Sequence, residues 1–177
     1  MRQIAIDTNV LVRLFVDDDL VQRDKALELL ENADSVIVPT TVFLECVWVL
    51  TRSYKMEKNL VLQQLRSFSE SIPNLVIQED ELGAGFAIME DNGDFADGVN
   101  EFLGRMMGAS CFVTFDRKAA VLLESKGLVV EHTSHTVDNF SFLHCLAWRI
   151  LFLYWGGLVS SYFLKRYRFC HSRLRLF

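Results

Sequence analysis

Residues 3–9 read Gln-Ile-Ala-Ile-Asp-Thr-Asn, a short apolar run that ends abruptly in three polar residues. Such a run is typical of a buried strand, here Gln3–Ile6, followed by a polar loop that begins at Asp7. In open α/β sheets, ligands bind at the carboxyl ends of the strands. The opening of the chain therefore predicts a parallel-sheet fold and a candidate site at Asp7.

The rest of the chain alternates between strand-like and helix-like patterns. Further strands are expected at residues 36–38, 75–77, 111–113 and 128–130, and helices at 11–15, 26–30, 42–50, 57–68, 80–89, 94–107 and 118–125. Parallel strands joined by helical crossovers form a sandwich with helices on both faces. We therefore expect an α/β fold, a three-layer α/β/α sandwich with a central, mostly parallel sheet.

Length and charge limit the classes of protein to consider. The chain has 177 residues, 51% of them hydrophobic, which suits one domain with a sizeable core and excludes a largely disordered protein.

The formal net charge is −5, but residues 141–177 contain six Lys or Arg and no acidic residue, leaving about −11 for residues 1–140. Contacts to phosphate need cations. If the ligand is a nucleic acid, metal ions must supply part of the positive charge.

The cysteines give no sign of a zinc site or a disulfide framework. Cys46, Cys111, Cys145 and Cys170 are widely spaced and form no CxxC pair. The N-terminus lacks the charged, apolar and small-residue regions of a signal peptide. We therefore expect a reduced, cytoplasmic protein.

Four acidic residues occupy positions that this architecture would bring together. Asp7 and Asp116 end two strands, whereas Glu45 and Asp97 stand among apolar residues of helices. Clustered carboxylates repel one another unless cations lie between them or some are protonated. Oxygen ligands select Mg²⁺ or Mn²⁺ rather than zinc, and such a site suits hydrolysis of phosphodiesters.

Each of these residues also has an ordinary structural role open to it. Asp7 and Asp116 can cap the helices that follow them, and Glu45 can pair with Arg13 or Arg52. Asp97 lies in the first turn of a helix, where the helix dipole favours negative charge. Each position alone is weak evidence for a metal site, and their joint placement is what favours one.

The four acidic positions lie in four short segments, which are Ile-Asp-Thr-Asn-Val-Leu-Val-Arg at 6–13, Leu-Glu at 44–45, Asp-Phe-Ala-Asp at 94–97 and Val-Thr-Phe-Asp-Arg-Lys-Ala at 113–119. Together these segments resemble VapC-type toxin ribonucleases of the PIN-domain family. The resemblance covers residues 1 to about 138. It implies that the catalytic residues, which bind Mg²⁺ with Mn²⁺ as a substitute, are Asp7, Glu45, Asp97 and Asp116. It also implies accessory roles for Asn9, Asp94 and Thr114.

The same resemblance implies the partners of the protein. They are an RNA substrate, a cognate antitoxin protein and a second copy of the chain in a homodimer. The alternative is a catalytically impaired PIN domain that acts only as a partner-binding module. A haloacid-dehalogenase-like phosphatase would need a second Asp two residues after Asp7, where this chain has Asn9.

Two segments depart from the family pattern. Gly98 follows Asp97 where an Ala-rich helix is usual, and glycine weakens a helix by about 1 kcal/mol relative to Ala. Residues 141–177 form an atypical apolar and basic extension beyond the expected nuclease domain, residues 1–140. Within it, residues 142–164 are long enough for a membrane span, but Arg149 near the middle makes a marginal anchor. An accidental extension is the favoured interpretation.

Overall fold

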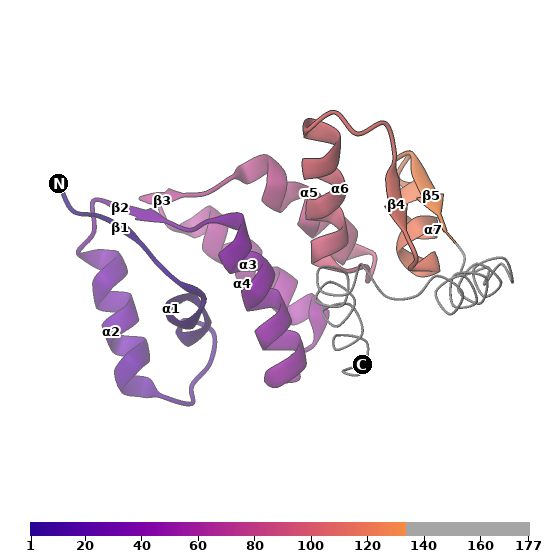
Figure 1. Cartoon of the computed structure of the whole chain (residues 1–177). Helices are drawn as coiled ribbons and strands as arrows, with labels where there is room; N and C mark the ends of the chain where they lie inside the picture. The colour runs from indigo at the N-terminus through magenta and orange to yellow at the C-terminus, as the bar shows by residue number, and fades with distance from the viewer. Residues whose placement is uncertain (134–177) are drawn as a thin grey trace, which may run out of the picture. The chain divides into compact units, whose positions relative to one another are not determined.

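The computed structural model describes residues 1–133, and the C-terminal extension with its candidate membrane segment lies outside them. In chain order the elements are β1 (Gln3–Ala5), α1 (Thr8–Arg13), α2 (Leu20–Glu31), β2 (Ser35–Ile37), α3 (Thr40–Trp48), η1 (Val49–Ser53), α4 (Lys58–Ser71), β3 (Leu75–Val76), α5 (Glu79–Glu90), α6 (Phe95–Met106), β4 (Phe112–Thr114), α7 (Arg117–Ser125) and β5 (Val130–His132). Figure 1 shows this arrangement. In the described part of the chain, no helix is both long and apolar enough to cross a membrane.

All the described strands pair in parallel, as the sequence predicts, but they form two sheets. The first has the order β1-β2-β3, with Ile4 opposite Val36, and the second pairs β4 with β5. Within residues 1–133 no ladder joins β1 to β4. The α/β fold with parallel strands is confirmed, but Asp7 and Asp116 follow strands of different sheets.

The last strand begins two residues later than predicted because the end of α7 uses the intervening residues. Gly127 has a φ of +80°, and its N–H donates to the carbonyl of Glu124 at 2.9 Å. The N–H of Leu128 donates to the carbonyl of Leu123 at 3.2 Å. This pair of bonds is a Schellman cap, which glycine in the left-handed region favours. Leu128 therefore belongs to the helix cap and not to the strand.

The main core is built around one face of α3. Phe43, Cys46 and Leu50 are fully buried, and α3 packs against α1, α5 and α6. Phe68 of α4 closes the cluster, with its ring centroid 6.4 Å from that of Phe43. Burial raises the pKa of the Cys46 thiol to about 12, and the neighbouring Glu45 charge adds to the effect. In the described residues, much of the core therefore lies between helices.

A π-helical turn, η1, extends α3. The N–H of Tyr54 donates to the carbonyl of Val49 at 3.2 Å, a bond that spans five residues instead of four. The Tyr54 hydroxyl donates to Asp18 Oδ2 at 2.7 Å, and Arg13 forms an ion pair with the same carboxylate. Single π-turns inside helices are rare and are frequent at functional sites. Arg52 lies within this turn, and the contact of Tyr54 with Asp18 holds the residue that follows it.

Helices α5 and α6 lie side by side and approach closely because glycine stands where they meet (Figure 1). A Cβ atom on Gly98 would overlap the backbone carbonyl oxygen of Ala84, and one on Gly85 would lie 2.5 Å from the ring of Phe95. Gly98 is therefore required for packing. Its low helix propensity is the cost of a close approach that holds the start of α6, with Asp94 and Asp97, against α5.

We predict that Gly98→Ala destabilises the protein by about 1–3 kcal/mol, because the new methyl group meets a backbone atom that cannot move alone. The matched control is Gly83→Ala in α5. Gly83 is exposed and a Cβ there would meet no atom within 4 Å. Alanine at 83 should stabilise the protein by about 0.5–1 kcal/mol through helix propensity. Urea unfolding measures both, and a gain in stability for Gly98→Ala would contradict the packing argument.

Candidate functional site

Three of the predicted acidic residues begin helices. Asp7 Oδ1 accepts from the N–H of Val10 at 2.9 Å, and Asp94 Oδ1 accepts from that of Ala96 at 2.9 Å. Asp116 Oδ1 accepts from the N–H groups of Lys118 at 2.7 Å and Ala119 at 3.2 Å. These aspartates therefore do cap helices, which is the structural role that the sequence left open for Asp7 and Asp116. In each case Oδ1 makes the cap, and Oδ2 has no hydrogen bond within residues 1–133.

Glu45 lies on the exposed side of α3 and is not a buried charge. Its Oε2 accepts a hydrogen bond of 2.6 Å from the hydroxyl of Thr8, whose exposed fraction is 8%. Neither arginine considered as a partner forms an ion pair with it in the described residues, since Arg13 pairs with Asp18. Because Thr8 follows Asp7, this bond ties Glu45 to the start of α1.

Asp97 is the half-buried member of a second acidic group. Burial raises the pKa of its carboxyl first, and the charges of Asp94 and Asp116 raise it further. The Lys58 ammonium acts in the opposite direction and lowers it. Asp116 follows β4, so carboxylates from two separate segments share one electrostatic environment. Thr114 supports this loop, because its hydroxyl accepts from the N–H of Asp116 at 3.0 Å.

The acidic residues thus form two groups, one beside Thr8 and one around Asp97, while Asn9 is exposed next to the first. Their carboxylate oxygens have the chemistry that Mg²⁺ and Mn²⁺ prefer. Among the residues that the structure describes, however, no three His, Cys, Asp or Glu side chains are placed to hold a metal ion together. The donors fit a divalent cation in kind, but they do not form a preassembled centre.

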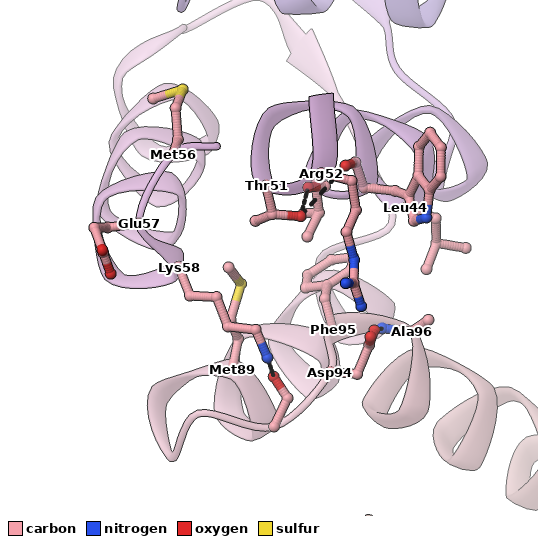
Figure 2. A pocket seen from close by; sticks show the side chains of 13 residues that line it. Leu44, Thr51, Arg52, Met56, Glu57, Lys58, Met89, Asp94, Phe95 and Ala96 are labelled. Carbon is pink, nitrogen blue, oxygen red and sulfur yellow. Dashed lines mark hydrogen bonds between the residues drawn. The ribbon is translucent and has the colours of Figure 1, made fainter. Parts of the chain in front are cut away.

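A pocket of 410 Å³ lies next to the second acidic group. Its lining comes from α3, η1, the start of α4, and the turn between α5 and α6, and includes Asp94 as the one predicted site residue. Lys58 Nζ donates to the backbone carbonyls of Asn92 and Gly93, both at 3.1 Å, and so holds the turn before Asp94. Figure 2 shows Arg52 extending into this pocket toward Asp94.

Sequence reasoning missed the residues that make this pocket distinctive. Trp48 lines it with an exposed fraction of 61%, and Arg52 and Lys58 bring two cations into an acidic protein. The exposure of Trp48 could have been predicted from the sequence. Val47 and Leu50 are three residues apart and share the buried face of the helix, so that Trp48 is turned away from that face. The direction in which the Arg52 side chain points could not be predicted in this way, because it depends on the π-turn η1.

Comparison with known families places these observations in context. The PIN domain family matches residues 4–122, a segment that contains all seven predicted site residues. The chain therefore belongs to the PIN domain family, and its fold is a nuclease fold. No match was found among curated proteins.

We predict that the capping role and the charge of Asp116 can be separated by substitution. Asp116→Ala removes the acceptor of two N–H groups and should cost about 1 kcal/mol, whereas Asp116→Asn keeps an oxygen for the cap and should cost much less. Denaturant unfolding of the two variants checks this. Equal losses of stability would show that the charge, and not the cap, stabilises the start of α7.

Proposed function

We propose that this protein is an endoribonuclease that hydrolyses RNA phosphodiester bonds and requires Mg²⁺ or Mn²⁺. The observation that carries the proposal is the group of Asp94, Asp97 and Asp116, drawn from two segments. Burial raises the pKa of Asp97, and repulsion from the charges of Asp94 and Asp116 raises it further. A divalent cation would relieve that repulsion. When bound, such an ion supplies an activated water and neutralises charge on the phosphate.

Each predicted site residue has a defined part in this proposal. The metal-binding and catalytic residues are Asp7, Glu45, Asp97 and Asp116, with Asn9, Asp94 and Thr114 as accessory residues. The support is their geometry. The helix caps fix Oδ1 of Asp7 and Asp116 and leave Oδ2 without a protein partner in residues 1–133, and Thr8 orients Glu45. Fixed carboxylates keep their oxygens in place for a cation at low entropic cost.

The biological setting is proposed from the family resemblance. We infer that the chain is the toxin of a toxin–antitoxin pair, that it acts in the cytoplasm as a homodimer, and that a cognate antitoxin blocks the acidic site. The free thiols of Cys46 and Cys111 suit a reducing compartment. The nuclease domain is proposed to span residues 1–140, with 141–177 as an extension.

One observation favours a second candidate function. Because no three potential ligands converge within residues 1–133, the chain suits a catalytically impaired PIN domain that only binds a partner. Such a protein would keep the fold and the caps but would not hydrolyse RNA. Metal-dependent cleavage separates the two candidates.

We predict that the purified full chain cleaves a mixed RNA pool with Mg²⁺ or Mn²⁺ and that EDTA abolishes the cleavage. Asp7→Asn and Asp97→Asn should each lower the cleavage rate at least about 100-fold, because loss of even an outer partner of a metal ligand costs 10- to 100-fold. Gel electrophoresis of end-labelled RNA measures the rate.

The matched control is Asp19→Asn. Asp19 caps α2 as Asp7 caps α1, with its carboxylate accepting from the N–H of Gln22 at 2.9 Å, but it has no part in the site. This variant should cleave RNA at the parent rate. Absence of cleavage by the folded parent in either metal would reject the nuclease and leave the binding module.

A further inference from the structure

The pocket beside Asp94 combines an exposed indole with a guanidinium one helical turn further on. Trp48, the last residue of α3, and Arg52 of η1 both line it. Thr51, which lies between them in the chain, turns its hydroxyl to the helix backbone and donates to the carbonyl of Val47 at 2.7 Å. Trp48 is 61% exposed, so it presents an aromatic surface to a ligand in the pocket.

The charges in the pocket leave Arg52 as the cation available to a ligand. Lys58 already donates to two backbone carbonyls, whereas Arg52 forms no side-chain hydrogen bond or ion pair with any residue from 1 to 133. Of the two acidic residues in the lining, Asp94 lies toward Arg52 but forms no ion pair with it in the described residues, and Glu57 points away from Arg52 in Figure 2. An unpaired guanidinium in a protein of net negative charge is a specific point of attachment for an anion.

We infer that this pocket is a subsite for one nucleotide of single-stranded RNA, with the base stacked on Trp48 and its phosphate held by Arg52. This inference rests on the proposed function for the identity of the polymer. An aromatic platform beside a cation is the combination that binds unpaired nucleotides irrespective of their sequence. A pocket of 410 Å³ is within the usual size range for a small ligand.

The position of the pocket gives this subsite a role in the reaction. Asp94 lines the pocket and caps α6, and Asp97 lies in the first turn of the same helix. A nucleotide held by Trp48 and Arg52 therefore brings the adjoining phosphodiester to the acidic group. Neither side chain is catalytic in this account, since both position the strand. Residues 1–140 carry a formal charge of about −11, so a cation in this pocket offsets part of their repulsion of RNA.

The test is the affinity of the full chain for a fluorescein-labelled single-stranded RNA, measured by anisotropy in EDTA so that no cleavage occurs. Trp48→Ala should weaken binding about 5- to 150-fold, and Trp48→Phe should keep most of the affinity because phenylalanine still stacks. Arg52→Gln should weaken binding and reduce the slope of log K against log salt by about 0.7, the value for one phosphate contact to a single strand.

Lys25→Gln is the charge-matched control, because Lys25 is an exposed cation on α2 outside the pocket. It should leave both the affinity and the salt slope unchanged. Thermal unfolding should show the same midpoint for all four variants, since Trp48, Arg52 and Lys25 are exposed.

Parent-like RNA binding by both Trp48→Ala and Arg52→Gln would overturn the subsite and assign the pocket to a protein partner instead. Cleavage is scored separately in Mn²⁺, so the two proposals fail independently. A chain that cleaves RNA but binds it equally well without Trp48 and Arg52 rejects only the subsite. A chain that binds through both residues but never cleaves rejects only the nuclease.

Discussion

The burial of one face of α3 is the constraint on which the rest of the described structure depends. Phe43, Cys46 and Leu50 fill the core, and α1, α5 and α6 pack against the same helix. Because helical side chains repeat every 3.6 residues, burial of this face forces Glu45 and Trp48 outward. The helices that begin near Asp7 and at Asp94 are therefore brought beside the exposed face of α3 by core packing. The acidic groups and the pocket are consequences of that packing.

Local pattern predicted the elements well, because each element is defined by hydrophobic periodicity over a few residues. The late start of β5 was not predictable from this pattern, since Leu128 is as apolar in a helix cap as in a strand. The π-turn at Val49–Ser53 was also invisible, because its apolar residues continue the pattern of α3. Division into two sheets depends on pairing between distant segments, which periodicity does not encode.

The residues of the candidate site could be predicted from the sequence, but their hydrogen bonds, exposure and neighbours could not. An aspartate at the start of a helix gives the same sequence signal for a cap and for a ligand, and Asp116 shows that one oxygen can cap while the other is left over. The sequence shows Glu45 as a charge within an apolar run, whereas in the structure Cys46 beside it is buried and Glu45 is exposed. Arg52 stands out only once its helix is placed beside α6.

The π-turn also bears on how this chain can be compared with its relatives. A π-turn contains one residue more than an α-turn, so that gain or loss of a single residue between Val49 and Ser53 would turn every later side chain of the helix by about 100°. Two homologues could then share an arginine in one alignment column while presenting it to different sides of the helix. When one relative has the extra residue and another lacks it, aligned residues beyond that point have side chains that point in different directions. Whether a relative has the same pocket must therefore be judged from the hydrogen-bond pattern of its helix.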